Sequence, residues 1–314
     1  MYYPYLRGKQ FELLALREFA EKNSGNCNVF PIIEPVKKSF SSIKTALKKL
    51  QEKDMHFAVI LNPQVGEMLH KTNDIEIELS DTLSDKDKWT PAYIVLNSNI
   101  ASIQAHIREK KHDDIMLICE DSVDTSNSEF DRLITLAGVS KVLIGNDNRS
   151  LKRKLEKLGK NVIRLDDKFK PQKRNADYLD ILEERFTEEH CYYKADGYFG
   201  FADYTVLQSG FSEGGRLPYA VAIHLTYEKN AEEVWVRHFV SDTNDDSSNI
   251  QGKFGEAAEK ATLFFAQLPY SNYAIGELSE YYIEGQYPGL GMLKKISIKS
   301  HLELMNGILN RIAE

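Results

Sequence analysis

The first 205 residues alternate between short apolar runs and stretches with helical spacing, and this alternation limits the fold more than any other feature. The apolar runs cover residues 2–6, 29–33, 57–61, 93–96, 115–119, 141–144, 162–165 and 199–205. The stretch after the first run places apolar residues on one helical face: Phe11, Leu14, Ala15 and Phe19. Continuous apolar strands that alternate with amphipathic helices predict βαβ units and a parallel sheet buried on both faces.

Eight strands in this order predict an α/β fold of the (β/α)8, TIM-barrel-like class. An open doubly wound sheet is the alternative, and a Rossmann sheet carries G-x-G-x-x-G after its first strand. Here the turn after the first run reads Arg7-Gly8-Lys9-Gln10, so that fingerprint is absent. The barrel is therefore the favoured architecture.

The alternation stops near residue 207. A glycine-rich stretch follows, and then two β-rich runs over 219–227 and 234–240 are joined by a polar turn that predicts a hairpin. Helical spacing resumes at 255–267, 271–282 and 292–312. We expect a parallel barrel over 1–207. Over 208–314 we expect a glycine-rich loop, a β-hairpin and closing C-terminal helices, packed on the barrel as part of one structural unit.

Polar side chains follow nearly every predicted strand. They are Arg7 and Lys9, Glu34, Asn62, Asn97, Glu120, Asn146 with Asp147, Asp166 and Asp203. In a parallel barrel, ligands bind at the carboxyl ends of the strands, so this set predicts a site at the mouth. The alternative is that strands end in polar loops by default, and that each residue is an ordinary turn former.

The turn after the first strand is suited to an anion. Gly8 permits a tight turn, and the free N–H groups at the start of the next helix favour negative charge. Arg7 can grip a phosphate or carboxylate with two parallel hydrogen bonds. The predicted anion-binding residues are Arg7, Gly8, Lys9 and Gln10. In the competing account, Arg7 and Lys9 pair internally with Glu34 or Asp203 and hold the mouth in shape without a ligand.

The acidic residues at the strand ends suit general acid–base chemistry or a hard divalent cation. The catalytic candidates are Lys9, Glu34, Glu120 and Asp203. The candidate ligands of Mg²⁺ are Glu34, Asp166 and Asp203, although their spacing does not demand a metal. A metal-assisted phosphoester hydrolase is the enzyme class that these residues fit, and the sequence does not decide whether the protein is an enzyme.

The formal net charge of −7 argues against a surface that coats nucleic acid. Between residues 149 and 174, however, eleven basic residues face only three acidic ones. The candidate contacts to nucleic acid or a partner protein are Lys152, Arg153, Lys157, Lys170 and Arg174. The hairpin over 219–240 is a second candidate surface. The alternative is an outer helix and loop whose charges are solvated.

The composition also indicates a compartment. Three widely spaced cysteines without a C-x-x-C motif support neither a disulfide framework nor a zinc knuckle. No apolar run approaches the ~20 residues that span a bilayer, and the N-terminal residues lack the pattern of a signal peptide. We expect a cytoplasmic protein without a membrane partner.

Two segments resemble a known family. The segment YPYLRGKQFELLAL supplies Pro4, Leu6, Lys9, Gln10, Glu12, Ala15 and Leu16, and VFPIIEPV supplies Pro31, Ile32, Ile33 and Glu34. This pattern resembles the beta-protein family of T4-like phages and bacterial genomes, and the later GFADYTVL is similar too. The resemblance implies a barrel-like fold and a role in phage defence or a mobile element. It brings no catalytic assignment, although it implicates Lys9, Gln10, Glu12 and Glu34.

Two functions follow from these observations. The first is a barrel protein of a bacterial phage-defence or mobile-element system, whose mouth binds or hydrolyses an anionic, phosphate-bearing small molecule. The second is a non-catalytic subunit that recognises nucleic acid or a partner protein through the basic segment over 149–174 and the hairpin. Clustering of the strand-end acids favours the first function, whereas a plugged mouth with an exposed basic face favours the second.

Overall fold

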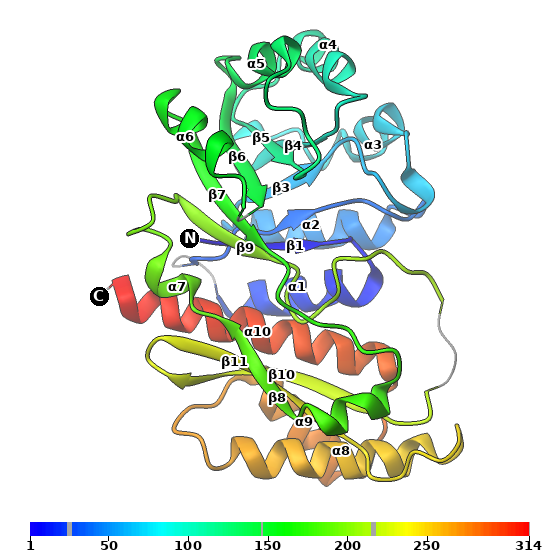
Figure 1. Ribbon diagram of the computed structural model, residues 1–314. Coiled ribbons are helices and arrows are strands. Elements are labelled where there is room, and N and C mark those ends of the chain that lie inside the picture. Colours follow the sequence, from blue (N-terminus) through cyan, green and yellow to red (C-terminus); the bar gives the residue numbers. More distant parts are fainter. Residues whose placement is uncertain (24–26, 146, 215–217, 314) are drawn as a thin grey trace.

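The computed structural model describes residues 1–23, 27–145, 147–214 and 218–313, and it contains a closed barrel of eight parallel strands (Figure 1). The barrel strands are β1 (Tyr2–Leu6), β2 (Ile32–Ile33), β3 (Phe57–Ile60), β4 (Trp89–Val95), β5 (Ile115–Cys119), β6 (Val139–Gly145), β7 (Asn161–Asp166) and β9 (Gly200–Asp203). The barrel closes where β1 pairs with β9, with Tyr2 opposite Phe201. Each strand overlaps one of the eight predicted runs, so the predicted barrel is confirmed.

Helices cover the outside of the barrel, and side chains fill its inside. The covering helices are α1 (Gln10–Lys22), α2 (Ser41–Glu52), α3 (Thr72–Leu79), α4 (Ile100–Lys110), α5 (Ser128–Ile134) and α6 (Arg149–Lys157), with short 3₁₀ turns η1 (Gly66–Met68) and η2 (Lys86–Lys88). Alternate residues of the strands point inward, and Tyr5, Ile60, Met116 and Leu143 belong to this inner core. The barrel is therefore a packed core, and a ligand can bind only at its rim.

Between β7 and β9 the chain leaves the barrel. It forms the 3₁₀ turn η3 (Asn175–Asp180), strand β8 (Glu183–Thr187) and the short helix α7 (Glu189–Tyr192). Strand β8 pairs antiparallel with β11, so it joins the appended sheet and not the barrel. No apolar run in the sequence predicts this strand.

The appended part contains the predicted hairpin, β10 (Ala222–Asn230) and β11 (Glu233–Val240), in the strand order β10-β11-β8. Its helices are α8 (Ile250–Phe265), α9 (Tyr273–Ile283) and α10 (Leu290–Ala313). Helix α10 lies between the barrel and the sheet, against α1 on one side and β10 on the other (Figure 1). One hydrophobic core extends from the barrel's outer layer through α10 to β11, and a second lies between the sheet and α8 and α9.

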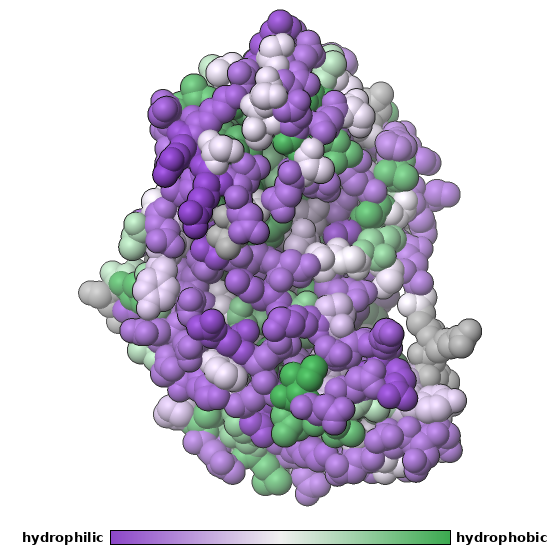
Figure 2. Space-filling view, viewed as in Figure 1, coloured by the Kyte–Doolittle hydropathy of each residue, from purple (hydrophilic) through white to green (hydrophobic). Residues whose placement is uncertain are grey.

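The exterior is mostly polar. In the view of Figure 2, hydrophilic residues dominate the face and the apolar patches are small and separate. Among the described residues, no helix has both the length and the apolar character that crossing a bilayer requires.

Candidate functional site

The turn between β1 and α1 needs glycine at its centre. Gly8 has a φ of +59°, and a Cβ at this position would lie 2.9 Å from the carbonyl oxygen of Glu34. A side chain here would be strained by the backbone conformation and would also press against the chain after β2. The turn therefore holds Arg7 and Lys9 close to the carboxyl end of the neighbouring strand.

Arg7 lies at the mouth between two tyrosines. The centre of its guanidinium is 5.5 Å from the ring centroid of Tyr5 and 5.9 Å from that of Tyr204. Its Nε is 3.3 Å from Oε2 of Glu34, and its Nη2 donates to the carbonyl oxygen of Ser209. Its buried Nη1 has no partner among the described residues. Arg7 is thus fixed in place, and its Nη1, like its Nε, makes no hydrogen bond within the described residues.

Glu34 is buried and fully engaged. Its Oε2 accepts a hydrogen bond from the Tyr5 hydroxyl (2.8 Å), and its Oε1 accepts one from the backbone N–H of Gln64 (2.8 Å). Together with the contact to Arg7, these bonds occupy both carboxylate oxygens. The structure thus contains the internal pairing of Arg7 with Glu34, and it gives Glu34 the environment of a positioning residue.

Tyr204 belongs to the same group of side chains as Arg7, Tyr5 and Glu34, although it is not among the residues predicted from the strand ends. Its ring packs 5.0 Å from that of Tyr5. Burial raises the pKa of Tyr204 to about 12, Arg7 opposes this shift, and the carboxylates of Asp167, Glu34 and Glu120 add to it. The exposed Glu120 is therefore near enough to act on the mouth electrostatically, although no hydrogen bond joins it to the cluster.

Lys9 lies beside Arg7 under the loop that follows β9. Its Nζ donates to the carbonyl oxygen of Ser212 (2.8 Å) and lies 4.6 Å from the ring centroid of Phe211. Burial lowers the pKa of Lys9; the nearby cations Lys294 and Arg7 act in the same direction, while Glu12 opposes them. The adjacent Gln10 is exposed at the start of α1.

Glu12 supplies the local counter-charge. It is 2% exposed, and its Oε2 accepts a hydrogen bond from the backbone N–H of Arg7 (2.6 Å). Burial raises the pKa of this carboxyl, which Lys9 and Lys294 partly offset. The buried Glu12 is thus the acid near Lys9 and Lys294, while the Arg7 guanidinium pairs with the buried Glu34.

These side chains line a cavity of about 310 Å³ between the barrel mouth and the appended sheet. Arg7, Lys9 and Glu12 form the barrel wall, Lys294 comes from the second turn of α10, and His224 comes from β10. Burial lowers the pKa of His224 to about 3, so its imidazole is neutral at ordinary pH and can still form hydrogen bonds. Lys294 and His224 are far from Arg7 in the sequence, so no local pattern pointed to them.

The start of α10 adds to the positive character of the cavity. Leu290 and Leu293 line it, and the helix begins at Leu290. The positive end of the helix dipole lies at this terminus, where the N–H groups of Met292 and Leu293 donate to the carbonyl oxygen of Gly289. The cavity therefore combines three cationic side chains with a helix start.

Asp203 and Asp166 do not lie in the mouth, which corrects two of the predicted positions. Asp203 accepts hydrogen bonds from the hydroxyl of Tyr2 (2.5 Å) and the backbone N–H of Thr205 (2.7 Å), in the layer beneath α10. Asp166 accepts a hydrogen bond from Arg164 (2.9 Å). Successive residues of a strand point to opposite faces, and both acids stand on the outward face.

The predicted Mg²⁺ ligand set is consequently not assembled, because Glu34 is at the mouth and both aspartates are outside the barrel. The catalytic set is divided in the same way: Lys9, Glu34 and Glu120 are at the mouth, while Asp203 is not. Within the described ranges, one group of three metal-binding side chains is close enough to share an ion, and it consists of Glu76, His106 and His112.

Other polar residues at the strand ends have structural roles. Asn62 is bonded to the backbone of β4: its side chain donates to the carbonyl of Ile94 and accepts from the N–H of the same residue (both 2.8 Å). Asn97 accepts a hydrogen bond from the N–H of Asp124 (2.7 Å). For these two residues the turn-former alternative holds. The predicted Asn146 is outside the described residues.

The basic segment is divided between two parts of the molecule. Lys152, Arg153 and Lys157 are on α6, which covers the barrel. Lys170 instead pairs with Glu184 of β8 in the appended sheet (2.6 Å). Acidic residues neutralise much of the charge, since Lys152 pairs with Glu156 and Arg174 with Asp177.

The predicted hairpin does not offer a free face. Ile223 and Leu225 of β10 face α8 and α9 in the second core. On the other side Thr226 contacts His301 of α10 (2.9 Å) and Val236 joins the barrel-side core. The sheet is therefore covered on both faces. Arg153 and Lys157 of α6 are exposed, and contact of the basic segment with nucleic acid or a partner protein stays a prediction.

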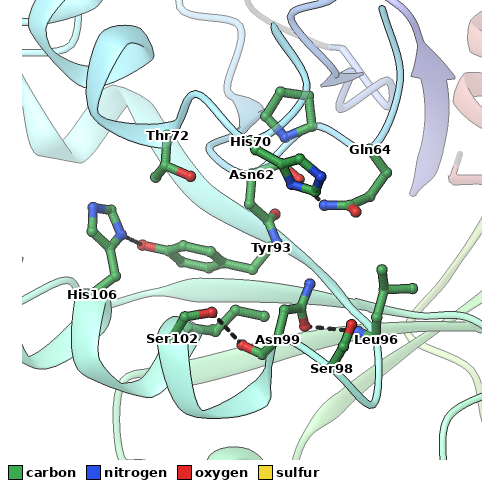
Figure 3. A pocket seen from close by; sticks show the side chains of 12 residues that line it. Asn62, Gln64, His70, Thr72, Tyr93, Leu96, Ser98, Asn99, Ser102 and His106 are labelled. Carbon is green, nitrogen blue, oxygen red and sulfur yellow. Dashed lines mark hydrogen bonds between the residues drawn. The ribbon is translucent and has the colours of Figure 1, made fainter.

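A second cavity, of about 450 Å³, lies beside the carboxyl ends of β3 and β4 (Figure 3). Asn62, His70, Tyr93 and His106 are among the residues that line it. In Figure 3 the Tyr93 hydroxyl points to the imidazole of His106, and Nδ1 of that ring is 2.9 Å away. The sequence analysis selected none of these residues except Asn62.

The fold and the first cavity define the class of the protein: a closed α/β barrel with an appended antiparallel sheet and a cation-lined cavity where the two meet. Comparison with protein-family models, with curated proteins and with solved structures finds no match to this chain.

Proposed function

We propose that the protein binds a small anionic ligand, bearing a phosphate or carboxylate group, in the cavity between the barrel mouth and α10. The observation that carries the proposal is the convergence of Arg7, Lys9 and Lys294 on one cavity in which Glu12 is the buried counter-charge. An anion between these side chains would relieve their mutual repulsion.

The contacts of Arg7 support the same proposal. Its Nη1 is buried without a partner, and a buried donor left unpaired costs about 1–3 kcal/mol. A ligand oxygen would supply the missing acceptor in a charge-assisted hydrogen bond. Tyr5, Tyr204 and Glu34 hold the guanidinium in position before the ligand arrives, which lowers the entropic cost of binding.

The proposal concerns binding, because the acids expected to catalyse hydrolysis do not converge. Lys9 and Glu12, two residues that carry the resemblance to the beta-protein family, line this cavity. The phage-defence or mobile-element setting that the resemblance implies is part of the proposal.

Titration calorimetry of the full chain with inorganic phosphate, pyrophosphate, ATP and citrate tests this function. We expect at least one of these anions to bind with 1:1 stoichiometry, with an affinity that falls as salt rises. Lys9→Ala and Lys294→Ala should each weaken binding about tenfold, which corresponds to ~1.4 kcal/mol. Lys48→Ala, which removes an exposed charge on α2, is the matched control and should bind as the wild type does.

Two results would overturn the proposal. One is the failure of all four anions to bind at millimolar concentration. The other is an equal loss of affinity in Lys48→Ala and Lys294→Ala, because that would indicate a general effect of net charge. Melting temperatures of the variants, measured without ligand, distinguish lost binding from lost folding.

A further inference from the structure

Four side chains from separate segments meet on the outer face of β4, away from the Arg7–Lys9–Lys294 cavity. Glu76 comes from α3, Tyr93 from β4, His106 from α4, and His112 from the loop before β5. Oε2 of Glu76 is 3.1 Å from Nε2 of His106, and Oε1 is 3.5 Å from Nε2 of His112. The Tyr93 oxygen is 2.9 Å from Nδ1 of His106 and 2.8 Å from Nδ1 of His112.

This cluster separates two cavities. Tyr93 and His106 line the cavity of Figure 3, whereas Glu76 and His112 line a smaller one of about 190 Å³ on the other side. The Glu76 side chain is 15% exposed and both imidazoles are 12% exposed. A small ion can therefore reach the cluster, while bulk water is largely excluded.

The hydrogen bonds of the cluster assign a tautomer to each neutral imidazole. The Tyr93 hydroxyl has one proton, so it donates to one Nδ1 and accepts from the other, which must carry a hydrogen. His106 can donate from Nε2 to Oε2 of Glu76 (3.1 Å), so its Nδ1 is the one that accepts the Tyr93 proton. His112 then donates from Nδ1 to the Tyr93 oxygen, and its Nε2, 3.5 Å from Oε1 of Glu76, keeps a lone pair that can bind a cation.

Tyr93 also orients both rings. A histidine that ligates a metal through one nitrogen usually donates or shares a hydrogen bond at the other, which fixes the tautomer and the ring plane. Here a single hydroxyl does this for two imidazoles, so both Nε2 atoms are directed at one carboxylate.

We propose that Glu76, His106 and His112 bind a zinc-type divalent cation, with a fourth position open toward the adjoining cavities. In a tetrahedral zinc site with bonds of about 2.0–2.2 Å, neighbouring ligand atoms are roughly 3.3–3.6 Å apart. One ligand atom from each of the three residues lies within 4.8 Å of the other two, so small side-chain movements would reach that spacing. Two histidines and a carboxylate with one open position is the ligand set of a catalytic zinc.

Lys110 pairs with the same carboxylate and would compete with an ion for it. Its Nζ is 2.9 Å from Oε2 of Glu76, and its side chain is 35% exposed, so it can turn to solvent when an ion binds. The charged or titratable groups near the His112 ring are Glu76, His106, Lys86 and Lys110. The competing account is a purely structural hydrogen-bond cluster that fastens α3 and α4 to β4.

The test is titration of the EDTA-treated full chain with Zn²⁺ by calorimetry and with Co²⁺ by visible absorption. We expect one ion per chain and the intense ligand-field bands of tetrahedral Co²⁺. Loss of an outer-shell partner lowers metal affinity ~10–100-fold, so Tyr93→Phe should weaken Zn²⁺ binding by an amount in that range. Glu76→Gln and His112→Gln change ligands and should each weaken binding at least as much. His70→Ala removes an exposed histidine that lines the same cavity and should bind Zn²⁺ as the wild type does.

Lys110→Met makes the test specific for this site. Removal of the competing ammonium should raise the affinity for Zn²⁺, whereas the structural account gives a less stable protein and no metal binding. The absence of 1:1 binding at micromolar Zn²⁺ would overturn the proposal. So would an equal loss of affinity in His70→Ala and His112→Gln. Circular dichroism of each variant in EDTA shows whether it is folded before metal is added.

Discussion

At the scale of single residues, the mouth depends on one backbone conformation. Gly8 has a positive φ, and the end of β2 lies where its side chain would be. Arg7 and Lys9 flank this glycine, so the conformation of Gly8 sets where both cations lie. Stability and ligand binding should therefore respond together to a change at this position.

Gly8→Ala should lower the free energy of unfolding by about 1–2 kcal/mol from the left-handed backbone alone, with a further cost from the contact with Glu34. Urea unfolding of the purified variant measures this change. Gly255→Ala is the matched control, because Gly255 is inside α8 and a Cβ there meets no atom within 4 Å. The free energy of unfolding of this control should rise by roughly 0.5–1 kcal/mol. Equal effects of the two substitutions would contradict the assigned role of Gly8.

The histidine pair on the hairpin should make stability depend on pH. Burial lowers the pKa of His224 to about 3 and that of His238 to about 4, whereas both titrate near 6.5 in the unfolded chain. The unfolded state therefore binds more protons below pH 6.5. This contribution to stability is complete above that pH and is lost as pH falls toward about 4 and then 3.

Urea unfolding of the wild type and of His224→Gln at pH 7.5 and pH 5 tests this dependence. The wild type should lose more stability between the two pH values than the variant does. His56→Gln, which removes an exposed histidine, should lose as much as the wild type. A variant with an unchanged pH dependence would show that His224 is not protected from protonation in the folded protein.

At the scale of elements, α10 connects the barrel to the appended part, and a buried ionic network fixes its position. Lys295 is 1% exposed, and both Lys295 and Lys299 contact Glu18 of α1 and Glu277 of α9. Burial of these ammonium groups is favourable only while both carboxylates remain, because an unpaired buried charge is costly.

Glu277→Ala should therefore destabilise the protein by about 3 kcal/mol, at the lower end of the range for a broken buried pair, since Glu18 still contacts both lysines. Chemical denaturation measures the loss. Glu129→Ala removes an exposed ion pair with Arg132 and should cost less than about 1 kcal/mol. A cost for Glu277→Ala no larger than that of the control would mean that the network adds nothing to stability.

The strand β8 shows why one element escaped prediction. Its sequence, EERFT, has neither an apolar run nor a clear alternation. Its acids are neutralised by distant residues: Arg237 is 2.6 Å from Glu183, and Lys170 is 2.6 Å from Glu184. Strand formation here depends on pairing with β11, and tertiary context of this kind overrides local propensity.

At the scale of the whole molecule, the barrel was predictable because most residues of the barrel strands are buried, so each strand contains an apolar run. The mouth was predictable only in part. Glu34 and Asp203 both follow barrel strands, yet the first is bonded to Tyr5 at the mouth and the second to Tyr2 outside the barrel. Strand register decides whether a residue at a strand end points into the mouth or away from it. Lys294 reaches the cavity through packing between parts of the chain that are far apart in the sequence.

The two parts should fold as one cooperative unit, because they share a core. Leu302 and Met305 of α10 pack in the same cluster as Leu16 and Phe19 of α1. A fragment over 1–207 would expose this apolar face and leave β8 without its partner strand, so it should not attain a fixed structure. The full chain should instead unfold in a single transition. Near-ultraviolet circular dichroism and the NMR amide spectrum of the fragment show whether it has a fixed structure. A well-dispersed amide spectrum of 1–207 alone would show that the barrel is an independent domain.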